Sequence, residues 1–430
     1  MPVNITVTNK PRIVIVGGGF GGIEFAKKLK HEDVQVVLLD KNNYHTFQPL
    51  LYQVATSGLE PDSIAFPLRK IFKTQSNFVF RMGEVFKIHP EIRTIETSIG
   101  DIVYDYLILA TGSQTNFFGM EDIQRNSVPM KSIPQALDLR SIILQNFEKA
   151  LLTVDLEERD SLMTFVVVGG GPTGVETAGA LGELKNHILP RDYPELDMNK
   201  MQIHVIEKTG RIFSTMSPSA SVKGEEFLKR FDVTLWLNTG IQSYDGKKVV
   251  LSNGKTLIST TVIWAAGVKG AVLDGLKPET IQSIRVKVDQ YNRVLGYENI
   301  FAVGDVAAMM TEKNPHGHPM LAPVAIQQGK QLADNIKRIL KKKSLKPFVY
   351  RSLGVMATVG RNRAVVDLPF IKFQGTFAWF VWMSVHLMTL VGFRNRLVVF
   401  VNWMWNYFSY DRGLRLIIPP VKRVVDGRQG

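Results

Sequence analysis

The stretch RIVIVGGGFGGIEFAKKLKHEDVQVVLLD, residues 12–40, decides the fold. After Arg12, four β-branched residues in a row are typical of a strand buried on both faces. The turn that follows has glycines at its first, third and sixth places, and they are Gly17, Gly19 and Gly22, with Phe20 among them. Such glycines permit a tight turn, contact between backbone and pyrophosphate, and close packing of helix on strand. A second apolar strand closes on Asp40, about where a ribose-binding acid belongs, so the stretch predicts a dinucleotide-binding Rossmann unit.

A near-copy of this pattern begins at FVVVGGGPTG, residues 165–174. Apolar residues at helical spacing follow it, and a strand over 201–206 closes on Glu207. The distance to this acid is longer than usual, which we attribute to a loop-like insertion around residues 190–194. The residues expected to line this second nucleotide site are Gly169, Gly171, Thr173, Gly174 and Glu207.

Three further apolar strands end in small or acidic residues. Residues 105–113 end in Ala110-Thr111-Gly112, residues 261–267 end in Ala265-Ala266-Gly267, and residues 299–305 end in Gly304-Asp305. Two linked Rossmann folds with a late strand ending in Gly-Asp predict two bound nucleotides. We expect FAD in the first fold, because Gly304-Asp305 is placed to hold the ribityl and phosphate side of a flavin, and a nicotinamide nucleotide in the second.

Length and composition bound the possibilities. A chain of 430 residues predicts two or three domains, and 45% hydrophobic with 21% charged residues is a globular composition. The net charge of +13 suggests an anionic partner, whether nucleic acid, an acidic membrane surface or phosphorylated cofactors. The absence of cysteine excludes disulfide-cycling flavoenzymes and thiolate metal clusters, and we expect no metal site. Residues 1–10 are polar, which argues against a secretory signal.

The last seventy residues differ in kind from the rest. Residues 373–393 carry no fixed charge, residues 397–410 are again uncharged, and Arg394 and Arg396 lie between them. A single spanning helix would contain several polar side chains, and a packed core or dimer interface would not explain the arginines. Interfacial amphipathic helices explain both the aromatic residues and the cations, so this interpretation is preferred.

The residues allow hydride transfer from one bound dinucleotide to the other. Glu207 would accept a hydrogen bond from a free ribose 2′-hydroxyl and repel a 2′-phosphate, which favours NADH, although Lys208 weakens that preference. The electrons would then pass to a membrane quinone, with dioxygen as the alternative. Glu176, expected in the first turn of the second Rossmann helix, could position the nicotinamide or relay a proton, or could only be an acid stabilised by the helix N-terminus.

The chain resembles the type II NADH:quinone oxidoreductases, the alternative NADH dehydrogenases. The resemblance rests on NYHTFQPLLYQVA (43–55), GGGPTGVE (169–176), AVGD (302–305), WFVWMSVH (379–386), FRNR (393–396) and WMWNYFSYDR (403–412). On composition alone, residues 41–55 are either a loop and helix folded over the cofactor or a surface loop with some aromatic residues.

The resemblance implies an α/β fold with two Rossmann-type domains and a C-terminal amphipathic helical membrane-anchoring region. It implies FAD-binding segments at 1–122 and 285–345, an NADH-binding domain at 123–284, and membrane association and dimerisation at 346–430. The implied FAD contacts are Gly19, Asp40, Lys41, Asn43, Val85, Ala110, Thr111, Gly112 and Asp305, and the implied NADH contacts are Gly171, Glu176, Glu207 and Ala266.

The resemblance also implies non-electrogenic reduction of menaquinone or ubiquinone on the cytoplasmic face of the inner membrane, or the equivalent organelle face, often by a homodimer. Its catalytic positions here are Glu176, Gln327 and Gln328, but Pro323 replaces the first glutamine of the family's motif, which leaves the quinone-contacting residue open. A soluble NADH oxidase is the rival enzyme. A flavoprotein that binds nucleic acid is disfavoured, because the positive charge gathers beside apolar segments and not along a polar groove.

Overall fold

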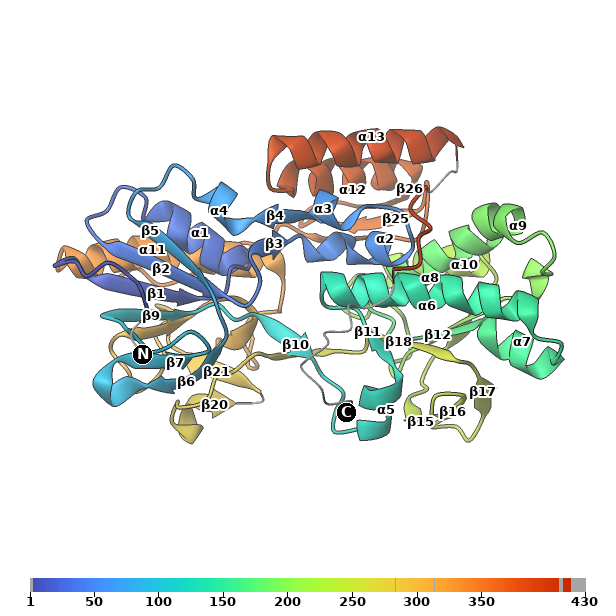
Figure 1. Ribbon diagram of the computed structural model, residues 1–430, viewed down its shortest axis with the longest axis horizontal. Coiled ribbons are helices and arrows are strands. Elements are labelled where there is room, and N and C mark those ends of the chain that lie inside the picture. Colours follow the sequence, from blue (N-terminus) through green and yellow to red (C-terminus); the bar gives the residue numbers. More distant parts are fainter. Residues whose placement is uncertain (1–2, 283, 313, 410–412, 419–430) are drawn as a thin grey trace, which may run out of the picture. The chain divides into compact units, whose positions relative to one another are not determined.

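The computed structural model describes residues 3–282, 284–312, 314–409 and 413–418 (Figure 1). The chain forms two compact units, each built from several segments. Unit 1 comprises Met1–Thr46, Ala65–Thr115 and Val268–Leu353, and unit 2 comprises Phe47–Ile64, Asn116–Gly267 and Gly354–Gly430. The end of the tail motif, Tyr410 to Arg412, lies outside the described residues.

Unit 1 is built on a parallel five-stranded sheet in the order β22-β9-β1-β2-β5. These strands are β22 (Ile300–Ala302), β9 (Tyr106–Leu109), β1 (Arg12–Val16), β2 (Gln35–Asp40) and β5 (Phe78–Met82). Side chains alternate across β1, so that Ile13 and Ile15 pack with α1 (Phe20–Lys28) and α11 (Ala322–Leu340). The predicted strand–turn–helix–strand order of residues 12–40 is confirmed, with strand β1 having the predicted bounds.

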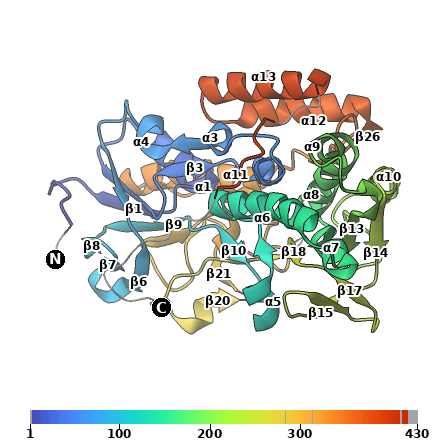
Figure 2. The same cartoon turned by 45° about the vertical axis from the view of Figure 1, so that its right-hand side comes forward.

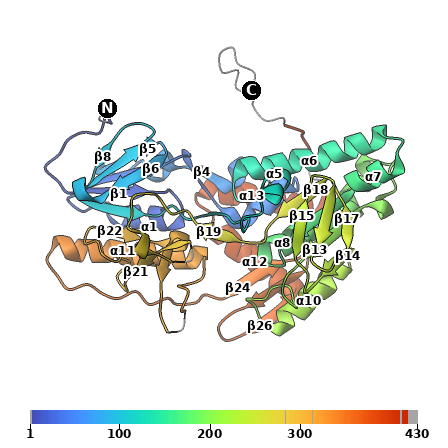
Figure 3. The same ribbon diagram turned by 90° about the horizontal axis from the view of Figure 1, so that it is seen from below.

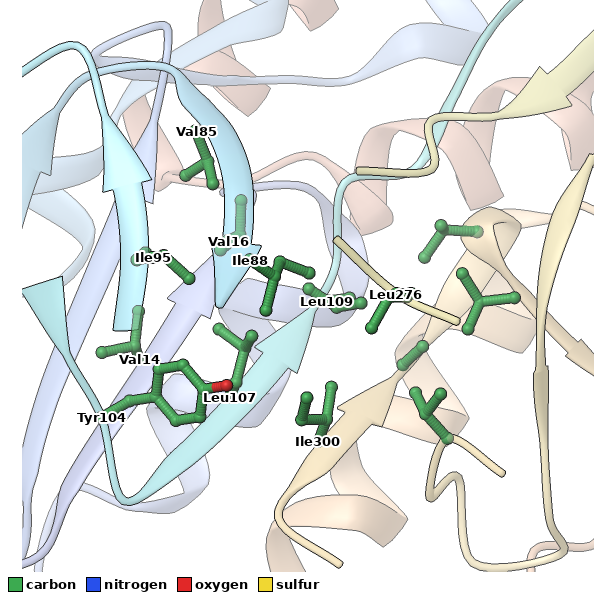
Figure 4. Packing of buried hydrophobic residues seen from close by; sticks show 14 of the residues in the cluster. Val14, Val16, Val85, Ile88, Ile95, Tyr104, Leu107, Leu109, Leu276 and Ile300 are labelled. Atoms are coloured by element: carbon green, nitrogen blue, oxygen red, sulfur yellow. The ribbon is translucent and has the colours of Figure 1, made fainter. Parts of the chain in front are cut away.

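The other face of this sheet is covered by smaller strands. Val14 and Val16 lie in a second buried cluster with Val85, Ile88 and Ile95 of the antiparallel sheet β6-β7-β8 (Figure 4). The remaining elements of unit 1 are β3 (Tyr44–Thr46), β4 (Ala65–Pro67), α4 (Leu68–Ile71), β6 (Val85–His89), η2 (Pro90–Ile92), β7 (Thr94–Thr97), β8 (Ile102–Val103), β10 (Ser113–Thr115), β19 (Val268–Gly270), η5 (Pro278–Thr280), β20 (Ile281–Gln282), β21 (Arg285–Val288), η6 (Gly304–Val306) and β23 (Ala307–Met309).

Unit 2 repeats this architecture with its own parallel sheet, ordered β11-β18-β12-β13-β14. These strands are β11 (Val128–Pro129), β18 (Thr261–Trp264), β12 (Thr164–Val168), β13 (Gln202–Ile206) and β14 (Val233–Trp236). On one face, Phe165 stacks against Phe147 of α6 (Ile133–Leu152), and α8 (Pro172–Glu183) follows the second glycine turn. The antiparallel sheet β15 (Ile241–Tyr244), β16 (Lys248–Leu251) and β17 (Thr256–Ile258) lies on the other face (Figure 3). Val166 and Val168 pack with its buried residues.

The C-terminal part of unit 2 consists of the antiparallel sheet β24 (Val355–Thr358), β25 (Ala364–Asp367) and β26 (Lys372–Gly375), followed by α12 (Thr376–Thr389) and α13 (Phe393–Ser409). The two helices lie side by side (Figures 1 and 2) and contact each other through buried Trp382 and Trp403, whose ring centroids are 5.8 Å apart. No helix among the described residues combines the length and the apolar character that crossing a bilayer requires.

The structure differs from the sequence-based expectation in two segments. The segment after α8, expected to be loop-like, is helical: a π-helical turn, η3 (Leu184–Ile188), leads into α9 (Leu189–Asp192), whose Pro190 occupies the first turn, where proline is tolerated. Residues 41–55 contain the short strand β3 as well as η1 (Gln48–Leu50) and α2 (Leu51–Ala55). The other elements of unit 2 are α3 (Pro61–Ile64), α5 (Glu121–Asn126), α7 (Leu156–Leu162), η4 (Met198–Lys200) and α10 (Pro218–Lys229).

Candidate functional site

The first glycine loop, in unit 1, is shaped by close backbone contacts. Gly17 has a φ of +110°, and a Cβ atom there would lie 2.2 Å from the carbonyl oxygen of Ala110. A Cβ atom on Gly22 would lie 2.1 Å from the carbonyl oxygen of Gly17. At Gly19, apart from its neighbours in sequence, no atom of the described residues lies within 4 Å of the corresponding Cβ position. Helix α1 begins at the next residue, Phe20. The loop therefore fits a pyrophosphate that approaches the backbone at a helix N-terminus.

Asp40 is fixed against this loop at the end of β2. One carboxylate oxygen accepts a hydrogen bond from the Gly18 amide at 2.6 Å, and the other accepts one from the Asn42 amide at 2.7 Å. Burial raises the pKa of Asp40, although both amide contacts act in the opposite direction. The Nδ1 atom of His45 lies 3.1 Å from the carbonyl oxygen of Gly18, and burial lowers the pKa of this imidazole to about 4. A carboxylate held in this way is suited to a ribose hydroxyl.

Three other predicted FAD-binding residues lie beside the loop in unit 1. Lys41 and Asn43 follow Asp40 with exposed side chains, and the Asn43 carbonyl accepts the Leu68 amide at 2.9 Å. Val85 is buried at the start of β6 and pairs with Thr97 of β7.

The small residues 110–112, which follow strand β9, form a second part of the candidate FAD site in unit 1. The Ala110 amide donates to the Val16 carbonyl at 2.8 Å, and the Thr111 hydroxyl donates to the Ala271 carbonyl at 2.6 Å. Gly112 has a φ of +70°, a left-handed conformation that favours glycine.

Gly304 and Asp305 are held by the side chains of Gln328 and Ser113, for which no sequence pattern predicts this role. Gly304 has a φ of +75°, and its amide donates to Oε1 of Gln328 at 2.7 Å. The Ser113 hydroxyl donates to Asp305 at 2.5 Å. No sequence motif marks Ser113, because its partner is 192 residues away in the chain.

The glutamines of the motif after Pro323 are engaged within unit 1. Gln328 is 1% exposed and braces the Gly304 turn. Gln327 donates through Nε2 to the Arg351 carbonyl at 2.9 Å and accepts from the Arg351 amide at 3.0 Å. Pro323 occupies the first turn of α11, where the missing amide costs no helical hydrogen bond.

The second glycine loop, in unit 2, repeats the geometry of the first. Gly169 has a φ of +113°, and a Cβ atom there would lie 2.6 Å from the Ala265 carbonyl oxygen. A Cβ atom on Gly174 would lie 1.9 Å from the Gly169 carbonyl oxygen. Gly171, like Gly19, has no atom of the described chain within 4 Å of its Cβ position, apart from its neighbours in sequence. The loop therefore fits a second pyrophosphate.

Glu207 takes the place of Asp40 in this copy. Its two oxygens accept the Gly170 amide at 2.6 Å and the Thr209 amide at 2.7 Å. Thr173 is exposed in the first turn of α8, where its carbonyl accepts the Thr177 hydroxyl at 2.7 Å, and Ala266 is half-buried just beyond the end of β18. The carboxylate after the strand and the glycine loop thus have a geometry that fits a ribose and a pyrophosphate in unit 2.

Glu176 is buried, with 7% of its surface exposed. Burial raises its pKa to about 8, while the Thr358 amide, which donates to its carboxylate at 3.3 Å, lowers it. Trp382 also lowers this pKa, by less than Thr358 does; its buried indole nitrogen lies near the carboxyl group without completing a hydrogen bond among the described residues. The helix begins at Pro172, so Glu176 lies in its second turn and the prediction of the first turn is wrong. Stabilisation by the first-turn amides therefore does not account for this carboxyl group.

An aromatic pocket lies between α2, α8, α12 and α13, all of them in unit 2. Its interior volume is about 80 Å³, and the open space at its mouth brings the hollow to about 740 Å³. Its lining is Tyr52, Gln53, Thr56, Gly58, Ala180, Glu183, Ile188, Thr358, Gly360, Arg361, Trp379, Trp382, Met383, Trp403, Asn406 and Tyr407. Thr358 and Trp382, which contact Glu176, are therefore also walls of the pocket. Thr358 carries no sequence motif, while Trp382 was signalled only by the uncharged aromatic run.

His386 of α12 contacts Trp382, one of the residues that line the aromatic pocket. Its ring stacks on Trp382 with centroids 4.1 Å apart, and its Nδ1 lies 2.8 Å from the Trp382 carbonyl oxygen. Burial lowers the pKa of His386 to about 4, so the imidazole is neutral at pH 7.

Comparisons with known proteins agree with these two cradles and the C-terminal helices. Residues 11–329 match the pyridine nucleotide-disulphide oxidoreductase family model, and residues 353–409 match the NDH2 C-terminal domain. The chain is 35% identical over 427 residues to the type II NADH:quinone oxidoreductase NdhA of Mycobacterium tuberculosis, covering 95% of this chain and 89% of that protein. It is 34% identical to Ndh of the same organism, covering 94% and 89%.

A solved structure shows the same fold. The structure of NDH2 from Plasmodium falciparum in complex with NADH superposes with a TM-score of 0.88 at 22% identity, covering 96% of this chain and all of that chain. Because the present chain has no cysteine, the disulphide chemistry named by the broader family has no residue to perform it. The chain belongs to the type II NADH:quinone oxidoreductases, membrane-associated, non-proton-pumping respiratory NADH dehydrogenases that use FAD to pass the hydride of NADH on as two electrons to a quinone.

Proposed function

We propose that unit 1 binds FAD, that unit 2 binds NADH, and that Glu176 supplies the proton that quinone reduction consumes while α12 and α13 lie on a membrane. The observation that carries this proposal is the buried carboxyl group of Glu176, which contacts a tryptophan of α12. FAD, when bound, supplies the hydride acceptor and the two-electron donor.

The choice of NADH rests on Glu207. Its carboxylate is held at the second glycine loop by two amides, in the same manner as Asp40 at the first. A carboxylate at this place accepts a hydrogen bond from a ribose 2′-hydroxyl and repels a 2′-phosphate. Lys208, next in the chain, offsets part of that repulsion.

The role of Glu176 follows from the proton balance. NADH, one proton and a quinone give NAD⁺ and a quinol, so one proton has to come from outside the hydride. A pKa of about 8 keeps Glu176 largely protonated at pH 7, which a proton donor requires. Two walls of the aromatic pocket, Thr358 and Trp382, are the contacts of Glu176. We infer that a quinone ring enters among these aromatic side chains. Gln327 and Gln328 then act by holding backbone segments of unit 1.

The surface of the protein that would contact the membrane is an apolar stripe along α12 and α13. The apolar stripe consists of Phe377, Phe380, Val385 and Met388 of α12 and of Phe393, Leu397, Phe400, Val401, Met404, Trp405 and Phe408 of α13. All of these side chains are exposed, at spacings that place them along one side of each helix. Phe377 is 69% exposed and Phe408 is 76% exposed, far more apolar surface than scattered residues present. Exposed Arg394, at the start of α13, adds positive charge for anionic lipid.

The supply of NADH favours the cytoplasmic face of the inner membrane or the equivalent organelle face. The homodimer implied by the family resemblance is a further proposal. Dimer formation would compete with lipid for the apolar stripe only if the dimer interface used the same side chains. Measuring the oligomeric state with and without vesicles tests that alternative.

Catalysis is tested by steady-state NADH oxidation with a short-chain quinone and with dioxygen alone. We expect the quinone to accelerate NADH oxidation far beyond the oxygen rate, and Glu176→Gln to slow the quinone-dependent rate about 100-fold. Glu157→Gln, at the start of α7, is the matched control and should leave the rate unchanged. Equal rates with quinone and with dioxygen alone would show that quinone is not the electron acceptor. A normal quinone-dependent rate for Glu176→Gln would show that Glu176 is not the proton donor.

Membrane binding is tested by flotation with phosphatidylethanolamine–phosphatidylglycerol vesicles. Phe377→Ser combined with Phe408→Ser should reduce the bound fraction severalfold, because each replaces an exposed aromatic ring that enters the lipid. Leu152→Ser combined with Val154→Ser removes two exposed apolar side chains from another part of unit 2 and should have no effect. Equal binding by both double variants would contradict the placement of the apolar stripe on lipid.

A further inference from the structure

A second hollow in unit 2 differs from the aromatic pocket in chemistry. This basic hollow, of about 460 Å³, is lined by Glu183, His187, Lys223, Phe227, Arg230, Arg361, Asn362, Arg363, Gly375 and Thr376. Four of these residues are cationic and one is acidic. The hollow therefore collects positive charge on one part of the surface, and the established reaction uses none of it.

Two of the charged residues are occupied by contacts within unit 2. The Arg361 guanidinium donates to the carbonyl of Tyr407 at 2.8 Å and to that of Asn406, near the end of α13. The Arg361 amide donates to the Glu183 carboxylate at 2.5 Å. These contacts join the hollow to the C-terminal helix, and the only acid of the lining is already accepting a hydrogen bond.

The other cations of the lining are Lys223, Arg230 and Arg363. Lys223 forms an exposed ion pair with Glu226 at 2.7 Å, which screens it only weakly. Arg363 lies over the ring of Phe231, with its guanidinium carbon 4.6 Å from the ring centroid, an arrangement that leaves its charge in place. Arg230 is exposed, and within the described residues its side chain forms no hydrogen bond or ion pair. Lys223 therefore shares its charge with Glu226, which also interacts with Arg230, while Arg363 has no acidic partner among the described residues; the excess of positive charge favours an anion here.

The surrounding charges agree with this interpretation. The pKa of His187 is lowered, first by burial and then by the positive charges of Arg361, Arg363 and Arg191, while Glu183 acts in the opposite direction. Three of the four charged groups that act on the imidazole are therefore cationic. In addition, α12 begins at Thr376, in the lining of the hollow, without a side-chain cap, which places the positive end of its helix dipole there.

Apolar side chains lie next to the basic hollow. Phe377 follows Thr376, is 69% exposed, and its ring lies 5.3 Å from that of Phe373. Phe377 is the first residue of the apolar stripe. A ligand that joins a negative group to hydrocarbon chains would satisfy both surfaces at once, and a soluble anion would satisfy only the first.

We propose that the basic hollow binds the phosphate group of an anionic phospholipid, whose acyl chains lie along Phe377 and the apolar stripe. This inference rests on the proposed membrane association and makes it specific for the lipid headgroup. Lys223, Arg230 and Arg363 pair with the phosphate, and the aromatic pair of Phe373 and Phe377 contacts the glycerol and the start of the acyl chains.

The test is calorimetric titration of the full-length flavin-loaded protein with dihexanoyl phosphatidylglycerol below its micelle concentration. We expect saturable binding with one lipid per chain and at least tenfold weaker binding by Lys223→Gln combined with Arg230→Gln. Dihexanoyl phosphatidylcholine, whose headgroup has no net charge, should bind at least tenfold more weakly to the unsubstituted protein. NADH oxidation with a short-chain quinone should be unchanged in the variant, because neither residue contacts a nucleotide loop.

Two matched variants separate a site from general attraction. Lys247→Gln combined with Lys248→Gln removes the same charge from the β16 hairpin, on the opposite side of unit 2 from α12 and α13 (Figures 1 and 2). Arg394→Gln removes a charge from the apolar helices outside the hollow. Both should retain the affinity for the soluble lipid, and an equal loss in either would overturn the proposal by showing diffuse attraction.

Inorganic phosphate distinguishes the source of the anion. If it binds as tightly as the short-chain lipid, with the same sensitivity to Lys223→Gln and Arg230→Gln, the site serves a free phosphate and the lipid assignment is wrong. Absence of saturable lipid binding also overturns the proposal. Flotation of the unsubstituted protein is measured separately, so failure of membrane association is recognised independently of failure of the hollow.

Discussion

At the residue scale, a carboxylate holds the same place in both nucleotide cradles. Asp40 and Glu207 each accept the amide of the middle glycine of their loop at 2.6 Å and one amide just beyond their own strand. Glutamate reaches one carbon further than aspartate, and a Cβ atom on Gly170 would lie 2.9 Å from the Glu207 side chain. The Glu207 side chain therefore packs directly against the second loop.

Glu207→Gln should relax the choice of nicotinamide nucleotide. The amide keeps the size of the side chain but removes the charge that repels a 2′-phosphate, so the ratio of kcat/KM for NADH to that for NADPH should fall about tenfold or more. Steady-state kinetics with both nucleotides and one short-chain quinone measure this ratio. Asp40→Asn is the paired control: it should weaken flavin retention and leave the nucleotide ratio of the flavin-loaded fraction unchanged.

Glu176 should also set the pH profile of quinone reduction. Its pKa, raised to about 8 by burial, means that the protonated donor is lost as the pH rises through that value. We expect kcat with quinone to decline above about pH 8 in the unsubstituted enzyme, while Glu176→Gln has a low rate without that decline. An unchanged alkaline limb in Glu176→Gln would show that another group titrates there.

At the element scale, α13 is tied to the segment that contains α2 and α3. Asn395 is 5% exposed and donates to the carbonyls of Asp62 and Ser63 at 3.0 Å and 3.1 Å. Trp403 donates to Gln53 at 2.8 Å, and Asn402 donates to Glu60 at 2.6 Å. These polar contacts hold the C-terminal helix by one face and leave its other face apolar and exposed.

Asn395→Ala should therefore destabilise unit 2. It leaves two backbone carbonyls without their donor, which costs about 1–3 kcal/mol. Thermal unfolding should shift downward by a few degrees, and cleavage by a protease near α13 should become faster. Asn199→Ala, an exposed asparagine on η4, is the control and should leave the unfolding temperature within a degree. Equal behaviour of the two variants would contradict the anchoring role.

Gly174→Ala tests the second glycine loop as an element. The added Cβ atom would lie 1.9 Å from the Gly169 carbonyl oxygen, so α8 or the loop has to move. We expect NADH affinity to fall at least tenfold, while the flavin absorbance of the purified protein is kept. The corresponding Gly22→Ala in the first loop should do the reverse, with loss of flavin, because its Cβ atom would lie 2.1 Å from the Gly17 carbonyl oxygen.

At the scale of the whole molecule, stability depends on pH through groups that burial shifts in opposite directions. The pKa of Glu176 is raised from 4.5 to about 8, so its stabilising contribution is complete below pH 4.5 and is lost as the pH rises to about 8. The pKa values of His45, His204 and His386 are lowered from 6.5 to about 4. Their contributions are complete above pH 6.5 and are lost as the pH falls toward 4.

Between pH 6.5 and 8, among these four groups, only Glu176 still changes stability. We expect the free energy of unfolding to fall by about 1–2 kcal/mol over this range, and Glu176→Gln to show no such fall. Denaturant titrations at pH 6.5, 7.2 and 8.0 measure the difference. A slope that persists in Glu176→Gln would assign the pH dependence to another residue.

The sequence by itself determined the two Rossmann folds, their strand–glycine–helix order and the acids at their strand ends. These features depend on local rules: β-branched runs form buried strands, and only glycine permits backbone contacts near 2 Å from a Cβ position. The uncharged aromatic tail also indicated two helices without the tertiary structure. The helical segment after α8 was predicted to be loop-like, because residues 190–194 begin and end with a proline; Pro190 instead occupies the first turn of α9.

Only the tertiary structure decided what surrounds the key side chains. Burial raises the pKa of Glu176, while Thr358 and Trp382 lower it in part, and the Thr358 contact spans 182 residues of sequence. Gln327 and Gln328 are occupied by the backbone of distant segments, which no motif discloses. The assignment of residues 47–64 to unit 2, and the clustering of Lys223, Arg230 and Arg363, likewise depend on long-range packing. Burial and charge density are properties of neighbours in space, and a single sequence reports only neighbours along the chain.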